Sequence, residues 1–288
     1  TCKQFMEQLE MRVNYENPML FLEDFEKIAD GTTSTVYKAR EKRTRVEVAV
    51  KRINLNLLKD KQLVINELSI TKKLNHANIV QFVDSFLLET ELWIVMEYMQ
   101  AGTLADVVAS SRMIEQQIAT VSKRLLEGLS YLHSRGIIHR DIKSDCVLIR
   151  EDGEVKLSDF GFSIELTPET PRRRSLVGTP YWMSPEIISR EPYNTAADIW
   201  SFGILVFEMV DGEPPYFNDI PPHAMRKIKE ESVPVMANLS RVSPMLQGFV
   251  EKMIVKDPLN RLSASELLWH PFLKKACSNH CLLPLLKK

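Results

Sequence analysis

The sequence predicts an α+β fold of two lobes, a small β-rich N-terminal lobe with one key helix and a large α-rich C-terminal lobe. Strand-like patterns occupy residues 25–50 and recur between residues 79 and 97. Residues 61–74 interrupt them with helical periodicity, and beyond Thr103 helical patterns dominate. The boundary between the lobes is expected at residues 97–102, with a cleft between them.

These patterns divide the chain into three parts. An N-terminal helical extension is predicted over residues 1–24, because residues 4–12 place apolar side chains at helical spacing. The main domain is predicted over residues 25–273, with an N-lobe at 25–97, a hinge at 97–102, a C-lobe at 103–273, and then a tail at 274–288.

Composition excludes several classes of function. Of the 288 residues, 44% are hydrophobic and 26% charged, which is ordinary for a globular protein with a full core. A net charge of -1 provides no overall attraction to nucleic acid or anionic membranes. The opening residues do not resemble a signal peptide, and the longest apolar stretch, Ile204–Val210, contains Glu208 and is too short to span a bilayer. No nucleic-acid partner and no direct membrane insertion are therefore expected.

The cysteines predict a reducing compartment. Cys2, Cys146, Cys277 and Cys281 show no framework spacing, so a cytoplasmic location without disulfides is expected. Cys277 and Cys281 with His280 could form a metal cluster, but a fraying C-terminal tail is the simpler interpretation.

The most informative segment is His139-Arg140-Asp141-Ile142-Lys143-Ser144-Asp145-Cys146, followed by Asp159-Phe160-Gly161. These strings resemble the catalytic and metal loops of protein kinases, in the expected order. Asp141 is the candidate base for a substrate hydroxyl, Lys143 the candidate contact to the transferring phosphate, and Asp159 the candidate magnesium ligand.

Cys146 departs from this pattern, because a second magnesium ligand, Asn, is expected at its position. Magnesium prefers hard oxygen donors, so a thiol is a poor and doubtful metal ligand. Either Cys146 simply packs, or the site fails to hold productive Mg·ATP.

The nucleotide-binding elements of the N-lobe are partly degenerate. Lys51 ends the strand-like Val48-Ala49-Val50-Lys51 and is the candidate ligand of the α- and β-phosphates, with Glu67 of the following helix as its ion-pair partner. The glycine-rich loop reads Ala29-Asp30-Gly31-Thr32-Thr33-Ser34-Thr35-Val36, so Gly31 alone retains the conformational freedom expected there.

The whole chain resembles the PAK family of Ser/Thr protein kinases, and in particular its second subgroup. The most specific strings are Val177-Gly178-Thr179-Pro180-Tyr181-Trp182-Met183-Ser184-Pro185-Glu186 and Asp211-Gly212-Glu213-Pro214-Pro215-Tyr216-Phe217, with Asp198-Ile199-Trp200-Ser201 and Arg261 before His270-Pro271-Phe272. Members of that subgroup carry Ser at the position of Cys146 and are active.

The resemblance implies ATP and Mg²⁺ as cofactors and a bilobal protein-kinase fold. It implies an ATP site that includes Ile28, Ala29, Gly31, Val36, Ala49, Lys51, Glu67, Met96 as gatekeeper, Glu97, Met99, Leu148 and Asp159. It also implies a buried ion pair between Glu186 and Arg261, and regulation by a Rho-type small GTPase through a region outside this chain.

Regulation is predicted from the segment between Asp159-Phe160-Gly161 and Ser184-Pro185-Glu186. Ser175 follows three arginines, Arg172–Arg174, where kinases carry an activating phosphate, and Arg140 is the expected receiver of that phosphate. Asp145 and Glu213 are candidates for an acidic surface that recognises Arg before the acceptor, so substrates with a basic context are expected. Thr179 together with Lys143 indicates Ser/Thr acceptors.

Three functions remain open from the sequence. An active Ser/Thr protein kinase is favoured by Lys51, Glu67, Asp141, Lys143 and Asp159. A pseudokinase or weakly active scaffold is the alternative, because of Ala29, Ser34 and Cys146. A small-molecule phosphotransferase is disfavoured by the peptide-positioning string Gly178-Thr179-Pro180-Tyr181-Trp182.

Overall fold

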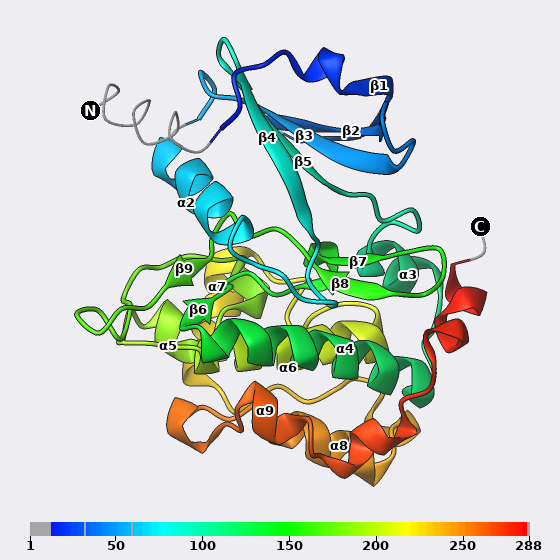
Figure 1. Ribbon diagram of the computed structural model, residues 1–288. Coiled ribbons are helices and arrows are strands. Elements are labelled where there is room, and N and C mark those ends of the chain that lie inside the picture. Colours follow the sequence, from blue (N-terminus) through cyan, green and yellow to red (C-terminus); the bar gives the residue numbers. More distant parts are fainter. Residues whose placement is uncertain (1–12, 32, 59, 287–288) are drawn as a thin grey trace. The chain divides into compact units, whose positions relative to one another are not determined.

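The computed structural model describes residues 13–31, 33–58 and 60–286, so the helix expected at residues 4–12 lies outside the described part. The chain divides into two compact units, Thr1–Gln100 and Ala101–Lys288. Each unit has its own elements and its own core, and Figure 1 colours them from blue to red along the sequence.

The first unit is built on one antiparallel sheet in the order β1-β2-β3-β5-β4. The strands are β1 (Leu22–Asp30), β2 (Ser34–Glu41), β3 (Glu47–Asn54), β4 (Phe82–Leu88) and β5 (Glu91–Glu97), and helix α2 (Lys61–Thr71) lies between β3 and β4 in the sequence.

Alternation along β3 gives the sheet two different faces. Val48 and Val50 pack with Trp93 in a cluster on one face. Ile53, on the opposite face, packs with residues of α2 in a second cluster that includes Val64, Ile65 and Leu68. Lys51 has the same parity as Ile53 and therefore points to the face that α2 covers.

Helix α2 begins at a defined cap. The side chain of Asp60 accepts a hydrogen bond from the backbone N–H of Gln62 at 2.9 Å, which satisfies one of the unpaired N–H groups of the first turn. The apolar face of the helix is buried against the sheet, with Leu68 fully buried. The cap and the packing together fix the position of α2 on the sheet, and with it the position of Glu67.

The start of the sheet differs from the expected boundary at Phe25. β1 begins at Leu22, because the buried Leu22 side chain joins the cluster around Trp93 and its backbone pairs with Glu41. Before it, Asn14 bridges to Phe86, and Pro18–Leu20 form a short 3₁₀ helix. Of residues 13–24, which were expected in a helical extension, those three alone are helical.

The second unit is mainly helical. Its helices are α3 (Leu104–Ser110), α4 (Glu115–Ser134), α5 (Pro185–Ile188), α6 (Ala196–Asp211), α7 (Pro221–Glu230), α8 (Pro244–Glu251) and α9 (Ala264–Leu267). Two short antiparallel strand pairs accompany them. In one, β6 (Ile137–Ile138) pairs with β9 (Ile164–Glu165), and in the other, β7 (Val147–Ile149) pairs with β8 (Val155–Leu157).

Helix α6 is the core of this unit. Every residue from Ala197 to Met209 is buried, and the helix ends at Gly212, whose φ of 90° is the left-handed conformation that favours glycine. Within the described residues, none of the helices combines the length and the apolar character needed to cross a membrane.

The C-terminal segment corrects two expectations. Cys277 and Cys281 form a disulfide, and Asn279–Leu285 form a 3₁₀ helix rather than a fraying tail. The fully buried side chain of Leu282 explains this order, because its burial removes apolar surface from water. No group of metal-binding side chains with His280 occurs among the described residues.

Candidate functional site

In the first unit, the predicted phosphate-binding lysine is held by its predicted partner. Nζ of Lys51, on β3, donates a hydrogen bond to Oε1 of Glu67, on α2, at 2.6 Å. The Glu67 carboxylate is largely buried, whereas Lys51 retains partial exposure. The ammonium is thus oriented by the helix.

Four of the residues expected around the adenine, Ile28, Val36, Ala49 and Met96, lie on strands of the sheet that carries Lys51. Val36 of β2 lies opposite Lys51, and Ala49 of β3 lies opposite Met96 of β5. Ile28 of β1 is 43% exposed, so its side chain has room for a ligand. The backbone N–H of Glu97 donates to the carbonyl of Gln81 at 3.0 Å, so an adenine amino group would have to use the Glu97 carbonyl.

The turn with the single retained glycine is tight but does not need glycine's left-handed conformations. The N–H of Gly31 donates to the carbonyl of Ser34 at 2.7 Å, and a Cβ at Gly31 would come 3.2 Å from that carbonyl oxygen. Ala29 pairs with Val36 in the β1–β2 ladder. The missing glycines are therefore compatible with a closed turn between β1 and β2.

In the second unit, Asp198 on α6 holds the catalytic loop. Its carboxylate accepts the backbone N–H groups of His139 and Arg140, both at 2.8 Å, and is 2.9 Å from Nε2 of His133. Burial alone would raise the pKa of Asp198, but the hydrogen bond and charge of His133, with that of His139, bring the pKa below its ordinary value. The anchor stabilises a loop in which Arg140 has φ of 71°.

The loop brings Asp141, Lys143 and Thr179 together. Oδ1 of Asp141 accepts hydrogen bonds from the N–H and the hydroxyl of Thr179 at 2.8 and 2.6 Å. Nζ of Lys143 lies 3.1 Å from the Thr179 hydroxyl and 3.4 Å from Oδ2 of Asp141. Burial lowers the pKa of Lys143, but the charge and contact of Asp141, together with the other groups around the ammonium, outweigh burial and raise the pKa above its usual value, so Lys143 stays a cation.

The predicted metal loop follows β8. Asp159 has φ of 63°, and its Oδ1 accepts the N–H of Gly161 at 3.4 Å. Phe160 is buried, with its ring centroid 5.2 Å from that of His139. His139 also lies 2.9 Å from the carbonyl of Ser158, so it links the catalytic loop to the residue before Asp159.

Cys146 is buried rather than exposed to a metal. Its thiol donates to the backbone carbonyl of Asp141 at 3.1 Å, and its own carbonyl accepts the N–H and hydroxyl of Ser158 at 2.8 and 3.0 Å. Burial, with the charges of Asp159 and Asp141, raises the pKa of Cys146 well above its usual value. The protonated thiol is therefore suited to donate a hydrogen bond and is not suited to bind Mg²⁺. The carboxylate of Asp159 offers the oxygen ligands that Mg²⁺ prefers.

Ser175 lies beside Arg140, as the sequence predicted. Nη1 of Arg140 donates to the Ser175 hydroxyl at 2.9 Å and lies 3.3 Å from the hydroxyl of Tyr193, which is 3.0 Å from the same Ser175 oxygen. Arg173 extends this contact through backbone hydrogen bonds to Tyr193 of 2.9 and 2.8 Å. Tyr193 was not predicted as part of this contact, because it reaches Ser175 through the fold and not through any local motif.

The predicted pair of Glu186 and Arg261 is confirmed. The two side chains form a bidentate ion pair, with Nη1 to Oε1 at 2.5 Å and Nη2 to Oε2 at 2.8 Å, and both are almost fully buried. Arg261 also donates to the carbonyls of Val255 and Lys256. The guanidinium connects α5 to the segment before α9, which is a structural role.

Asp145 and Glu213, the residues predicted to recognise Arg in the substrate, are both exposed. The side chain of Glu208 is close to both of their surroundings. Glu213 and Glu208 line the same cavity of about 400 Å³, and the charge of Asp145 contributes to the raised pKa of Glu208. No direct contact between Asp145 and Glu213 occurs in the described hydrogen bonds and ion pairs.

Glu208 itself was missed by sequence reasoning. Its carboxylate accepts the hydroxyl and N–H of Ser144 and the indole N–H of Trp182, the last at 2.6 Å. These hydrogen bonds lower the pKa of Glu208, but burial outweighs them and raises it to about 7. A glutamate within the apolar sequence of α6 was the available signal, because a buried carboxylate needs partners.

A family model for the protein kinase domain matches residues 22–273, so the chain belongs to the protein kinase domain family and has its fold of a β-rich N-lobe and an α-rich C-lobe.

Its relatives place it more narrowly. It is 52% identical over 287 residues to "Serine/threonine-protein kinase PAK mbt" of Drosophila melanogaster, covering 100% of this chain and 45% of that protein. It is 49% identical over 286 residues to PAK 5 of Rattus norvegicus (99% and 40% covered) and 48% identical over 286 residues to PAK 4 of Homo sapiens (99% and 48% covered). The predicted resemblance to PAK kinases is confirmed, and the chain spans about half the length of these relatives.

Proposed function

We propose that this chain is an active Ser/Thr protein kinase domain that transfers the γ-phosphate of ATP to hydroxyl groups in basic sequence contexts. The observation that supports it most is the set of contacts among Asp141, Lys143 and Thr179, because phosphoryl transfer depends mainly on positioning and charge stabilisation. The relatives named above are serine/threonine-protein kinases, which favours this function over that of a scaffold.

The residues have distinct roles in this proposal. Lys51, oriented by Glu67, binds the α- and β-phosphates, and Asp159 holds Mg²⁺. Magnesium, when bound, neutralises charge that develops on the phosphates. Asp141 orients and deprotonates the substrate hydroxyl, and Lys143 stabilises the transferring phosphoryl group. The adenine of ATP would lie among the side chains of Ile28, Val36, Ala49, Met96 and Leu148, with hydrogen bonds to the backbone of Glu97 and Met99.

Ser175 is proposed as the activating phosphorylation site. A phosphate on its hydroxyl would bring about two negative charges to the guanidinium of Arg140, which already contacts the unmodified oxygen. A charge-assisted hydrogen bond is stronger than the neutral one it replaces. Because the backbone of Arg140 is bound to the same Asp198 carboxylate as His139, ordering of the loop at Ser175 would be passed directly to the catalytic loop.

Substrate choice is proposed to depend on acidic residues. Asp145 and Glu213 would attract Arg before the acceptor, and Arg172–Arg174 before Ser175 would make self-phosphorylation possible. The native chain should phosphorylate a peptide with Arg before Ser faster than the same peptide with Ala in place of Arg. An Asp145→Lys/Glu213→Lys variant should lose this preference, and unchanged selectivity would refute the role of the two acidic residues.

We propose that a Rho-type small GTPase regulates the protein through a region outside this chain, and that the protein is cytoplasmic, on the basis of the PAK resemblance.

The activity itself is tested by phosphate incorporation into a basic Ser peptide with Mg·ATP. The native chain should phosphorylate Ser and Thr peptides but not a Tyr peptide, and Asp141→Asn should abolish the signal. Equal signals from both proteins would leave a scaffold function instead.

A further inference from the structure

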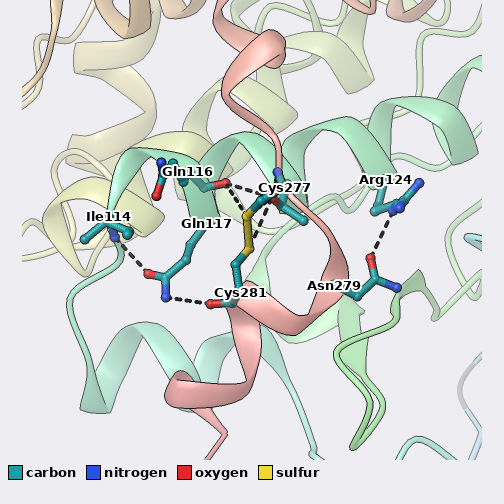
Figure 2. Close-up of a disulfide and its surroundings, with 8 residues drawn as sticks. Ile114, Gln116, Gln117, Arg124, Cys277, Asn279 and Cys281 are labelled. Carbon is teal, nitrogen blue, oxygen red and sulfur yellow. Dashed lines mark hydrogen bonds between the residues drawn. A yellow bond between two sulfur atoms is a disulfide. The ribbon is translucent and has the colours of Figure 1, made fainter.

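The C-terminal disulfide has no part in the proposed phosphoryl transfer. It joins Cys277 to Cys281, with a Cα–Cα distance of 6.4 Å and a sequence separation of 4. Both cysteines are half-buried, unlike Cys146, which is buried. Figure 2 shows the bond facing α4, between Gln116 and Gln117 of that helix and the turn at Asn279.

One hydroxyl of α4 contacts both sulfur atoms. Oγ1 of Thr120 lies 3.3 Å from Sγ of Cys277 and 3.4 Å from Sγ of Cys281. That hydroxyl has a single hydrogen, which it donates to the carbonyl of Gln116 at 2.8 Å, and it accepts the N–H of Cys277 at 3.0 Å. Its second lone pair therefore faces sulfur atoms that, in the disulfide, have no proton to donate.

A reduced thiol would fill this position. An S–H group on either cysteine could donate to the second lone pair of Thr120, and Sγ of Cys277 is also 4.0 Å from the carbonyl of Gln116. The surroundings thus offer acceptors to the two-thiol form as well as space for the disulfide.

Other contacts hold the same segment independently of sulfur. Nε2 of Gln117 donates to the carbonyl of Cys281 at 2.9 Å, and Nε of Arg124 donates to Oδ1 of Asn279 at 3.3 Å (Figure 2). The side chain of Leu282 is fully buried. Breaking the disulfide therefore leaves the segment attached to α4 while removing one constraint on it.

We propose that Cys277 and Cys281 are a reversible thiol–disulfide site whose redox state sets how firmly residues 276–286 are held on α4. In reduction, the thiolate of a small-molecule thiol such as glutathione attacks one Sγ, and the other cysteine leaves as a thiolate that takes up a proton. A second thiol resolves the mixed disulfide. The balance is one protein disulfide and two thiols giving two cysteine thiols and one external disulfide, and reoxidation is the reverse.

The first test is the redox titration of the native chain in glutathione buffers of graded potential, with differential alkylation read by mass spectrometry. Cys277 and Cys281 should gain and lose label together, as a two-electron couple within the range that glutathione buffers cover. Cys146 should remain unlabelled until the chain is unfolded, which makes it an internal control. Labels on Cys277 and Cys281 that vary independently, or a pair that glutathione at no ratio reduces and reforms, would overturn the proposal.

Thr120→Val tests the part played by the hydroxyl. The valine keeps the shape but removes the acceptor for the thiol, so the pair should become severalfold harder to reduce at a given glutathione ratio. Ser122→Ala, on the same helix with a buried hydroxyl, is the matched control and should leave the midpoint unchanged. Equal midpoints for native chain and Thr120→Val would show that the hydroxyl does not serve the reduced form.

The second test is hydrogen exchange of the 276–286 segment in the two redox states. Because the closed ring is small, its constraint is modest, and reduction should speed exchange in this segment on the order of tenfold. Exchange in β1 should not change. A Cys277→Ser/Cys281→Ser variant should exchange like the reduced chain under both conditions. Identical exchange in oxidised and reduced native chain would refute the effect on the segment, whether or not the domain is an active kinase.

Discussion

The guanidinium of Arg140 lies 2.9 Å from the hydroxyl of Ser175, which follows it by 35 positions in the sequence. The backbone N–H of the same arginine is bound to Asp198 in the centre of the second unit. One residue therefore joins the candidate phosphorylation site to the buried anchor of the catalytic loop. A charge added at Ser175 would act on the residue next to Asp141.

Removal of the Ser175 hydroxyl should prevent activation. After incubation with Mg·ATP, we expect Ser175→Ala to phosphorylate a basic peptide at least tenfold more slowly than the native chain, because the phosphate that pairs with Arg140 cannot form. Initial rates before and after phosphatase treatment measure this. Thr170→Val, which loses only a contact to Thr167, is the control, and an unaffected Ser175→Ala would show that the contact is not regulatory.

The pair of Lys51 and Glu67 should matter for catalysis more than for stability. We expect Glu67→Gln to lower kcat/KM for ATP by about 10- to 100-fold, since the neutral amide orients the ammonium less well, while thermal unfolding shifts little. Glu91→Gln, which removes the partner of Arg52 on the same sheet, should leave kcat/KM within about twofold. A similar loss in both variants would indicate a general effect on the sheet.

Glu208 should make stability depend on pH. Its pKa is raised from 4.5 to about 7 in the folded chain, so the fold binds more protons than the unfolded chain between those values. The free energy of unfolding of the native chain should fall relative to Glu208→Gln as pH rises through this window, by roughly 3 kcal/mol in total. Urea unfolding at pH 5, 6, 7 and 8 measures the difference.

Glu115 provides the comparison of opposite sign. Burial raises its pKa, but hydrogen bonds from Lys275 and Ser243 outweigh burial and lower it. The stability that native Glu115 adds over Glu115→Gln should therefore be present at neutral pH and be lost as pH falls below about 4.5. Parallel pH profiles for the two variants would contradict the assignment of Glu208.

Cys146 should act as a hydrogen-bond donor to the carbonyl of Asp141. We expect Cys146→Ser and Cys146→Asn to keep or raise activity, because both side chains can donate, whereas Cys146→Val should lower kcat several-fold with little change in KM for the peptide. Peptide kinetics at saturating Mg·ATP separate these outcomes. A large loss in Cys146→Asn would mean that the thiol has a role beyond this contact.

The buried pair of Glu186 and Arg261 should be among the most sensitive structural contacts. Glu186→Gln leaves a buried guanidinium without its counter-charge and should destabilise the second unit by about 3 to 5 kcal/mol. Chemical denaturation measures this loss. Lys227→Met, which breaks a partly exposed pair with Asp219, should change the stability far less.

Local patterns predicted much of this chain. Alternation around Lys51, the helical spacing around Glu67 and the order of the Asp141 and Asp159 segments identified the elements, because each signal lies within a few residues. The resemblance to PAK kinases supplied the pairing of Glu186 with Arg261. The contact of Arg140 with Ser175 was anticipated from their motif positions alone.

Other features depend on contacts between distant parts of the chain, which spacing does not reveal. Asp198 and Glu208 are charged residues in an apolar helix, and their partners at His139 and Ser144 become visible only in three dimensions. Tyr193 similarly reaches Ser175 through folding. The disulfide was missed because a spacing of four residues fits many conformations, and the contacts with Thr120 that accompany it come from α4.

The most direct test of the central claim is a single-turnover measurement of phosphoryl transfer from ATP to a basic Ser peptide, together with the Kd of ATP by calorimetry. Asp141→Asn should lower the transfer rate by about 10²- to 10⁴-fold, the range for loss of a general base, with an unchanged Kd. A transfer rate equal to that of the native chain would contradict the assignment of Asp141 as the group that activates the substrate hydroxyl.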